Sequence, residues 1–401
     1  MLSLDVLRDL ATETPSKIVL LVLDGLGGLP RPDTGKTELE TARTPNLDGV
    51  ASRSICGLTD PVSPGITPGS APGHLALFGY DPVKCLVGRG ILEALGIDFD
   101  IKTGDVAARG NFCTVDSDGI ITDRRAGRIS TEKNAELCRA LSGIKLDGAE
   151  LFVVPVKEHR LAVVFRGEGL SGDVTDSDPQ KVGLLPHTVE AHSPQAEKVA
   201  RLANDFIAKA KTILADHHPA NMVLLRGFSQ HPDLPTMKDI YKLDAAAIAS
   251  YPMYRGLARL VGMEILDTGP TVADEFETLA QHYDQHNFFF VHVKKTDSSG
   301  EDGDFDAKVH VLEEFDAQLP KVLALNPDVL VVSGDHSTPA LLKSHSWHPV
   351  PTILCSEWCR PDSVREFSES ACASGGLGRL PAVHIMPLAM ANALKLTKFG
   401  A

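Results

Sequence analysis

The chain lacks any apolar run of the length that a membrane helix needs. No stretch approaches the ~18–20 apolar residues that span a bilayer, so we expect no membrane partner. Residues 1–10 lack the basic start, the long apolar core and the cleavage site of a secretory signal peptide. These absences predict a cytoplasmic protein.

Positive charge and cysteine are also scarce. Lysine and arginine total 39 against 53 acidic residues, which gives a formal net charge of −14 and disfavours nucleic acid as a partner. A small anionic substrate is compatible with this net charge, because a local arginine cluster or a metal ion can make the electrostatic potential positive within one site. Of the seven cysteines only Cys355 and Cys359 are close, at a spacing that fits no common zinc pattern. The set favours reduced thiols.

What the chain does contain is an alternation of apolar strands and amphipathic helices. A strand at 17–23 opens the chain, and strands at 328–333 and 350–355 follow a helix at 306–325. This alternation predicts an α/β fold, with a mainly parallel sheet covered by helices on both faces. The Ala- and Leu-rich segment 243–263 predicts another helix.

The middle of the chain has a different texture. Alternating apolar residues predict β-hairpins at 106–124 and 151–165. Helices are expected at 130–141, with Ser130 as N-cap, and at 195–214. This segment has the pattern of an α+β domain.

A chain of 401 residues is too long for one compact core. We therefore predict a discontinuous domain formed by 1–105 and 236–401, with an inserted domain at 106–235.

Three strands of the buried type end in aspartate. Residues 17–23 run into Asp24, the strand that begins at Phe288 runs into Asp297, and the strand before Gly334 runs into Asp335 and His336. In α/β sheets, sites form at the carboxyl edge of the strands. We expect one metal-binding edge, assembled from distant segments.

The candidate ligands at this edge mix carboxylates with imidazoles. They are Asp24, Asp297, Asp335, His336 and His345. Such ligands suit Mn²⁺, Zn²⁺ or Mg²⁺. Five are too many for one tetrahedral ion and indicate two, and two ions about 3.5–4 Å apart can clamp a phosphoryl group and activate a nucleophile.

A loop rich in proline and glycine, residues 64–74, offers a nucleophile. Ser70 follows Gly69, which lets the backbone approach a ligand closely. A serine hydroxyl needs a base or a metal ion to react, so proximity to the metal ligands favours Ser70 as a catalytic residue. Thr67 is the competing hydroxyl.

These segments resemble the alkaline phosphatase superfamily and, more closely, the archaeal-type 2,3-bisphosphoglycerate-independent phosphoglycerate mutases. The resemblance covers nearly the whole chain in the family's order. Asp-His and Asp-Gly indicate only the superfamily, whereas the long Ser70 loop and the Asp-Arg-Arg-Ala-Gly-Arg run are specific to the mutases. The matching segments are Val22–Gly28, Thr44–Asp48, Pro64–Pro82, Ala108–Phe112, Asp123–Arg128, Lys294–Asp297, Gly334–His336 and His345–Pro351.

The resemblance implies a reaction of glycolysis and gluconeogenesis. Ser70 would take the phosphoryl group of 3-phosphoglycerate, and the 2-hydroxyl of the reoriented glycerate would take it back, with no 2,3-bisphosphoglycerate. It also implies two divalent ions, Mn²⁺ foremost, with Mg²⁺, Co²⁺ or Zn²⁺ as alternatives. Asp24, Ser70, Asp335 and His336 would hold one ion; Asp297, His345 and residue 301 would hold the other.

Residue 301 departs from the family, which usually has histidine there. Glu301 offers a carboxylate oxygen, which makes the second site more anionic and better suited to Mn²⁺ or Mg²⁺ than to Zn²⁺. Arg255 is a second departure, where relatives often carry lysine. It keeps a cation for phosphate but cannot donate a proton.

The implied substrate, phosphoglycerate, carries a phosphate and a carboxylate, and arginine binds both through paired hydrogen bonds. His159 is a candidate proton shuttle or carboxylate ligand. Together with Arg255, the predicted substrate-binding residues are Arg109, Arg124, Arg125, Arg128, His159, Arg160 and Arg226.

Two alternatives remain open. One is another enzyme of the superfamily: a phosphatase, a phosphopentomutase, or a phosphotransferase acting on a hydroxy-amino acid such as homoserine. The other is a non-catalytic descendant that binds an anion, against which Ser70, Asp335 and His336 argue. The sequence does not settle the oligomeric state, and a homo-oligomer stays open.

Overall fold

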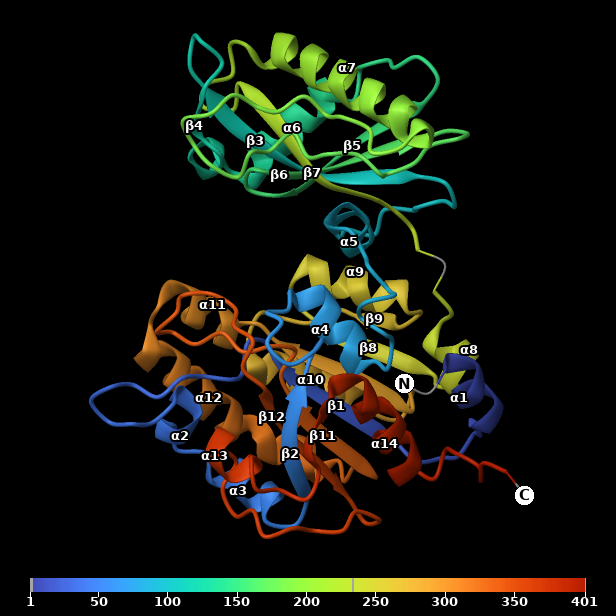
Figure 1. Ribbon diagram of the computed structural model, residues 1–401, viewed down its shortest axis with the longest axis vertical. Helices are drawn as coiled ribbons and strands as arrows, with labels where there is room; N and C mark the ends of the chain where they lie inside the picture. The colour runs from blue at the N-terminus through green and yellow to red at the C-terminus, as the bar shows by residue number, and fades with distance from the viewer. Residues whose placement is uncertain (1–2, 233, 401) are drawn as a thin grey trace. The chain divides into compact units, whose positions relative to one another are not determined.

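The computed structural model describes residues 3–232 and 234–400. The chain divides into two compact units, one formed by Met1–Leu86 with Leu234–Ala401 and the other by Val87–Asp233 (Figure 1). The second unit includes helix α5 (Arg89–Gly96), which lies before the segment 106–235 that the sequence pattern marks as the insertion. No helix of the described chain has both the length and the apolar character that crossing a bilayer takes.

The described residues of the first unit form an eight-stranded sheet in the order β13-β2-β12-β11-β1-β10-β8-β9. β1 lies between β10 and β11 and runs parallel to both, whereas β12 is antiparallel to β11 and β2. The predicted α/β fold class, with a mainly parallel sheet, is confirmed. The strands are β1 (Ile18–Leu23), β2 (Ile55–Asp60), β8 (Ala245–Ala249), β9 (Glu264–Leu266), β10 (Phe288–Val293), β11 (Val329–Ser333), β12 (Val350–Ser356) and β13 (Gly378–Pro381).

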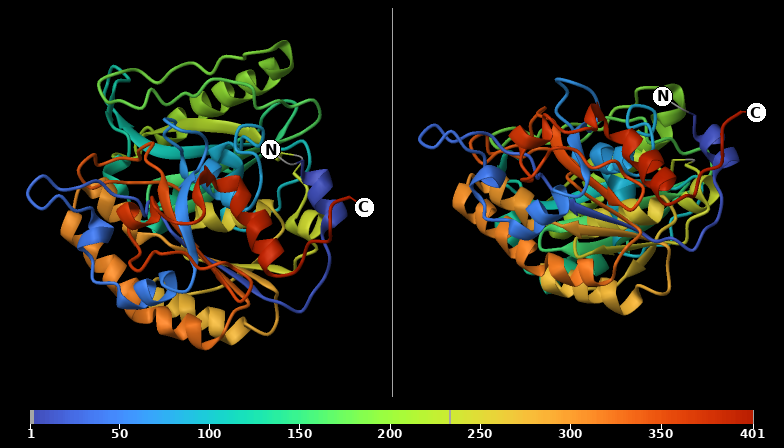
Figure 2. Two further views of the ribbon diagram at one scale, coloured as in Figure 1. Left: turned by 60° about the horizontal axis from the view of Figure 1, so that its bottom comes forward. Right: turned by 90° about the horizontal axis from the view of Figure 1, so that it is seen from below.

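Helices cover this sheet on both faces, which is why β1 is apolar along its whole length rather than alternating. On the face that carries Val19 and Leu21 lie α3 (Pro45–Ala51), α10 (Val272–His282) and α12 (Phe305–Ala324). Figure 2 shows α10 and α12 side by side beneath the sheet.

The other face carries Phe290 and His292 of β10. Their rings contact residues of α4 (Ser70–Leu77) and α9 (Pro252–Leu260). The remaining helices of this unit are α1 (Leu4–Leu10), α2 (Glu38–Thr41), α8 (Met237–Tyr241), α11 (Lys295–Asp302), α13 (Glu369–Cys372) and α14 (Ile385–Asn392).

The prediction of one helix over 243–263 is wrong in its first part. Residues Ala245–Ala249 form strand β8, parallel to β10, and the helix α9 begins only at Pro252. Alanine favours helices in isolation, but β8 lies next to β10 and all five of its residues are buried. Tertiary packing overrides the local preference here.

The second unit is built on an antiparallel sheet, of which the structure describes five strands: β3 (Val106–Val115), β4 (Ile121–Asp123), β5 (Glu150–Lys157), β6 (Arg160–Arg166) and β7 (Met222–Gln230). β3 pairs with β6 on one side and β7 on the other. Helices α6 (Thr131–Leu141) and α7 (Glu197–Leu214) contribute to one core, and α5 packs against Ala107 and Ala162 in a smaller one.

The parallel register brings three polar chain segments to one edge of the first sheet. Leu23 is level with Val293, and Val22 is level with Ser333. The segments that follow β1, β10 and β11 therefore leave the sheet together, and these segments carry Asp24, Asp297 and Asp335.

Candidate functional site

Asp24 is fully buried directly after β1 and is surrounded by cationic and hydrogen-bonding groups. The Lys294 ammonium donates to its Oδ2 at 3.0 Å, and the Tyr254 hydroxyl donates to the same atom. The Nε2 atoms of His292 and His336 each lie 3.3 Å from the carboxylate. Burial alone would raise the pKa of Asp24, but Lys294 and the two imidazoles hold it well below its ordinary value.

Asp335 and His336 follow β11 in a turn that only glycine permits. A Cβ at Gly334 would lie 2.7 Å from Leu26 Cβ and 2.8 Å from the carbonyl oxygen of Leu23. Asp335 Oδ2 lies 3.2 Å from His336 Nε2 and 3.1 Å from His74 Nδ1. Burial lowers the pKa of His336, but Asp335 and Asp24 raise it to about 9.

Ser70 is the first residue of α4, directly after the proline- and glycine-rich loop. Its Oγ lies 3.2 Å from His336 Nε2. Gly73 lets the helix approach the site, because a Cβ there would be 2.0 Å from the carbonyl oxygen of Asp335. The N-terminus of a helix favours negative charge, so this position suits an oxygen nucleophile. Thr67, the competing hydroxyl, is exposed.

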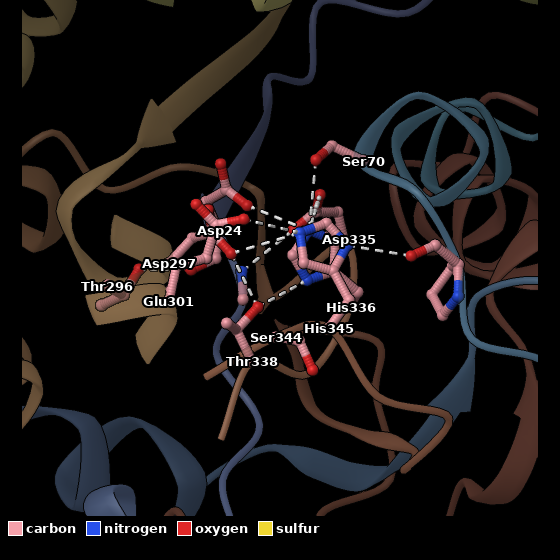
Figure 3. A network of polar contacts seen from close by, with 12 residues as sticks. Asp24, Ser70, Thr296, Asp297, Glu301, Asp335, His336, Thr338, Ser344 and His345 are labelled. Atoms are coloured by element: carbon pink, nitrogen blue, oxygen red, sulfur yellow. Dashed lines mark hydrogen bonds and ion pairs between the residues drawn. The ribbon is translucent and has the colours of Figure 1, made fainter. Parts of the chain in front are cut away.

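A second group lies beside the first and draws on α11 and the loop before β12. His345 Nε2 lies 3.5 Å from Asp297 Oδ1 and 3.8 Å from Glu301 Oε1. The His345 ring stacks on His336 with centroids 3.6 Å apart. The Glu301 side chain is 55% exposed, whereas that of Asp297 is 2% exposed. Figure 3 draws both acids with their neighbours.

The donor atoms fit divalent cations. Among the described residues, two groups bring their donor atoms within 4.8 Å of one another: Asp24, Asp335 and His336, and Asp297, His336 and His345. Asp24 Oδ1 and Asp335 Oδ2 are buried without a hydrogen-bond partner in the described chain. Such oxygens are unfavourable unless something satisfies them, and a cation would do so. Glu301 lies outside both groups.

Lys294 links the two groups and had no role assigned from the sequence. Its ammonium donates to Asp24 and also to Asp297. Burial lowers the pKa of Lys294, but the two carboxylates raise it above its ordinary value. Its place at the end of β10, one helical turn before Asp297, is a signal that sequence reasoning could have used.

Three other residues of the site also had no role assigned from the sequence. The hydroxyl of Thr338 contacts Asp297 and His336, whereas His74 and His292 contact Asp335 and Asp24. All three are fully buried, and their residue types alone carry no pattern that distinguishes them from ordinary core residues.

The second unit contains an arginine pocket of about 150 Å³, lined by Arg109, Asn111, Arg124, Arg125, His159, Arg160 and Arg226. Arg109 is level with Arg226 on the neighbouring strand, and Asn111 is level with Arg160. The sequence placed these arginines on separate elements, and the sheet brings them together.

The electrostatics of the arginine pocket favour an anion. Burial, with Arg160, Arg125, Arg109 and Arg128 nearby, lowers the pKa of His159 to about 4, so its imidazole is neutral at physiological pH. Burial and the neighbouring guanidinium groups likewise lower the pKa of Arg226 to about 10. Arg124 is held by two hydrogen bonds to Asp178, at 2.6 and 2.9 Å.

Two of the predicted substrate-binding residues are not among the lining residues. Arg128 acts on His159 through its charge but does not line the arginine pocket. Arg255 lies on α9 in the first unit and pairs with Asp267 at 3.0 Å.

Comparison with known proteins agrees with the motifs. The family model for 2,3-bisphosphoglycerate-independent phosphoglycerate mutase matches residues 51–221. A Thermotoga petrophila protein named as a probable enzyme of that kind is 54% identical over 394 residues, with 98% of each chain covered. A Thermus thermophilus protein with the same name is 51% identical over 401 residues, covering 99% of each chain.

Solved structures give the same result. A Pyrococcus horikoshii protein superposes with a TM-score of 0.84 at 29% identity, covering 96% of this chain and 99% of its own. The cofactor-independent phosphoglycerate mutase of Thermoplasma acidophilum superposes with a TM-score of 0.72 at 32% identity, covering 94% of this chain and 100% of its own. The chain belongs to the 2,3-bisphosphoglycerate-independent phosphoglycerate mutases and is an isomerase.

Proposed function

We propose that the chain interconverts 3-phosphoglycerate and 2-phosphoglycerate by passing the phosphoryl group through Ser70. The observation that carries this proposal is the place of the Ser70 hydroxyl, at the start of α4 and 3.2 Å from His336 Nε2. The reaction needs no 2,3-bisphosphoglycerate, because the serine itself stores the phosphoryl group.

Each half of the reaction exchanges one oxygen–phosphorus bond for another. Ser70 Oγ loses its proton and bonds to phosphorus while the bond to the C3 oxygen breaks, and that oxygen takes up a proton. The 2-hydroxyl of the reoriented glycerate then loses its proton and bonds to phosphorus, and Ser70 recovers a hydroxyl. The substrate ends as an isomer with no net change in atoms.

The residues around Ser70 would hold two divalent ions. Asp24, Asp335 and His336 would bind one, and Asp297, His345 and Glu301 the other. Bound ions supply positive charge that lowers the pKa of a serine hydroxyl and neutralises phosphoryl oxygens. Lys294 adds a fixed cation between Asp24 and Asp297, and the N-terminus of α4 adds a partial one.

The arginine pocket would bind an anionic group of phosphoglycerate. Guanidinium groups recognise phosphate and carboxylate through paired hydrogen bonds, and neutral His159 would add a hydrogen bond without changing the charge. We propose that Arg124, while held by Asp178, contacts the anionic group, and that Arg128 acts on it only through its charge. The other arginines proposed to contact the anionic group directly are Arg109, Arg125, Arg160 and Arg226.

Our choice of metal rests on Glu301 as a proposed ligand. A carboxylate in place of an imidazole favours a hard ion, so we propose Mn²⁺, with Mg²⁺ as the closest substitute and Zn²⁺ or Co²⁺ as weaker ones. We also propose a cytoplasmic location, where phosphoglycerate is found.

The test is an assay of metal-reconstituted protein with 3-phosphoglycerate, in which enolase reports 2-phosphoglycerate and no bisphosphoglycerate is present. Turnover that depends on Mn²⁺ supports the proposal. Turnover of a phosphopentose, or phosphoryl transfer to homoserine, without mutase activity would favour another enzyme of the superfamily. Absence of all these activities, with no metal bound, would favour a non-catalytic anion-binding protein.

A further inference from the structure

We infer that Thr338 is a positioning residue that couples the two metal-binding groups. Its side chain is fully buried, and its hydroxyl donates to Asp297 Oδ1 at 2.7 Å. The same oxygen lies 3.0 Å from His336 Nδ1 (Figure 3). A hydroxyl has one proton, and the Thr338 hydroxyl uses it in the hydrogen bond to Asp297. Its oxygen can therefore only accept a hydrogen bond from His336, which must carry its proton on Nδ1.

This arrangement fixes the tautomer of His336. An imidazole that binds a metal ion is neutral, and with its single proton on Nδ1 the His336 ring presents the lone pair of Nε2, the nitrogen that lies 3.3 Å from Asp24 Oδ1 and 3.2 Å from Asp335 Oδ2. A group that holds the outer nitrogen of a ligating histidine orients the ring and raises its affinity for a metal ion.

The same hydroxyl touches both metal-binding groups. His336 belongs to both of them, and Asp297 belongs to the second. Any shift of Asp297 on metal binding moves the acceptor of the Thr338 hydroxyl, and thereby the hydrogen bond that orients His336. Binding at one group therefore alters the hydrogen bond that orients a ligand of the other.

The backbone of Thr338 is held in place by hydrogen bonds to groups that are not metal ligands. The buried Lys308 ammonium donates to the carbonyl oxygens of Thr338 at 2.9 Å, of Gly25 at 2.8 Å and of Gly27 at 3.1 Å. The Thr338 N–H donates to the carbonyl oxygens of Gly25 and Gly27 at 3.2 and 3.1 Å.

The Thr338 side chain packs directly against two glycines, where any side chain would collide with it. A Cβ at Gly25 would lie 2.5 Å from Thr338 Oγ1, and a Cβ at Gly300 would lie 2.9 Å from Thr338 Cγ2. The rotamer is thus fixed by the backbone around it, so the hydroxyl can orient its two partners.

The inference rests on the proposed metal sites, and calorimetric titration of Mn²⁺ into metal-stripped protein tests it without an activity readout. Thr338→Val keeps the shape and deletes the hydroxyl, whereas Thr338→Ser keeps the hydroxyl. We expect Thr338→Val to bind Mn²⁺ about 10- to 100-fold more weakly at both sites and Thr338→Ser to bind close to wild type. Metal-free Thr338→Val should also melt at a lower temperature, because it leaves Asp297 Oδ1 without a buried hydrogen bond.

Equal Mn²⁺ affinity of wild type and Thr338→Val would overturn the inference and leave the proposed function intact. No binding by the wild type would overturn both. If Thr338→Val fails to fold, the same titration of Thr338→Ala against Thr338→Ser decides: weaker Mn²⁺ binding by Thr338→Ala supports the inference, and equal binding overturns it.

Discussion

At the scale of single residues, the site depends on a serine whose surroundings come from distant parts of the chain. Ser70 lies beside His336, and Asp24, Asp335 and Lys294 complete its electrostatic environment. In the proposed mechanism each of these groups acts on Ser70 or on the phosphoryl group it receives.

Ser70→Ala should abolish mutase turnover, because the variant lacks the oxygen that stores the phosphoryl group. The substitution removes one partly exposed hydroxyl, so the melting temperature should stay within about 2 °C of wild type, in line with a small change in stability. The enolase-coupled assay and a thermal melt measure both. Measurable turnover by Ser70→Ala would rule out this serine as the nucleophile.

Glu301→His should shift the metal preference from Mn²⁺ toward Zn²⁺, because an imidazole is a softer ligand than a carboxylate. Competition between the two ions, read by elemental analysis of the purified protein, gives the ratio. Asp302→His is the matched control, since Asp302 is the neighbouring exposed acid on α11. The same shift in both variants, or in neither, would exclude Glu301 as a ligand.

At the scale of elements, the strands that form the arginine pocket hold like charges close together, which lowers the stability of the fold. Arg226 lies on β7 among other arginines, and burial and repulsion lower its pKa to about 10. The sheet tolerates this unfavourable position, which marks it as a binding site rather than a source of stability.

Arg226→Met should raise KM for phosphoglycerate by about 10- to 100-fold, the value of a hydrogen bond to a charged group, and should leave the melting temperature equal or higher. Arg166→Met is the control on the same sheet, at the end of β6. It removes the partner of buried Asp105, which Arg166 binds at 2.7 and 2.9 Å. That variant should melt at a lower temperature with KM unchanged. A lower melting temperature for Arg226→Met with normal KM would mark Arg226 as structural.

Helix α10 carries a buried acid whose titration affects stability. Burial raises the pKa of Glu275 from its ordinary 4.5 to about 8. Between these values the folded state binds the proton more tightly than the unfolded state, so stability falls as the pH rises through this window.

Glu275→Gln should therefore stabilise the protein by at least about 1 kcal/mol at pH 8 and change little at pH 4.5. Urea denaturation at the two pH values measures the difference. Glu277→Gln, a change at an exposed site on the same helix, should show no such pH dependence. A Glu275→Gln effect that is equal at both pH values would contradict the assigned pKa.

The sequence predicts an element correctly where its hydrophobic pattern is strong. The apolar run at 17–23 and the helix at 306–325 have unambiguous periods, and both form. The alanine-rich pattern of residues 245–249 predicts a helix wrongly, because it is compatible with either structure and only the pairing with β10 makes it a strand.

The same limit applies to the site. Asp24, Ser70, Asp297, Asp335 and His336 carry reactive groups next to strand ends or glycines, so their residue types already indicate chemistry. Thr338, Lys308 and Tyr254 are ordinary residue types, and of the three only Thr338 lies close in sequence to a motif residue, two positions after His336. Their contacts with the site arise only when α9, α12 and the loop after β11 pack together.

At the scale of the whole molecule, metal binding should add to the stability of the fold. The buried carboxylates of Asp24 and Asp335 have no hydrogen bond at Oδ1 and Oδ2 respectively within the described chain, although imidazole nitrogens lie nearby. Chelation should lower the melting temperature, and Mn²⁺ at about 100 times its Kd should restore about 2.7 kcal/mol per site. Thermal melts with and without chelator measure this, and identical melts would contradict a bound ion.

The central claim is that Ser70 carries the phosphoryl group during turnover, and mass spectrometry of protein quenched in acid tests it most directly. The Mn²⁺-loaded protein would be mixed with 3-phosphoglycerate, without bisphosphoglycerate, quenched during turnover and digested. The account predicts one added phosphoryl group on the peptide that contains Ser70, absent from Ser70→Ala. Sustained turnover with that peptide unmodified, or phosphorylated at another residue, would contradict it.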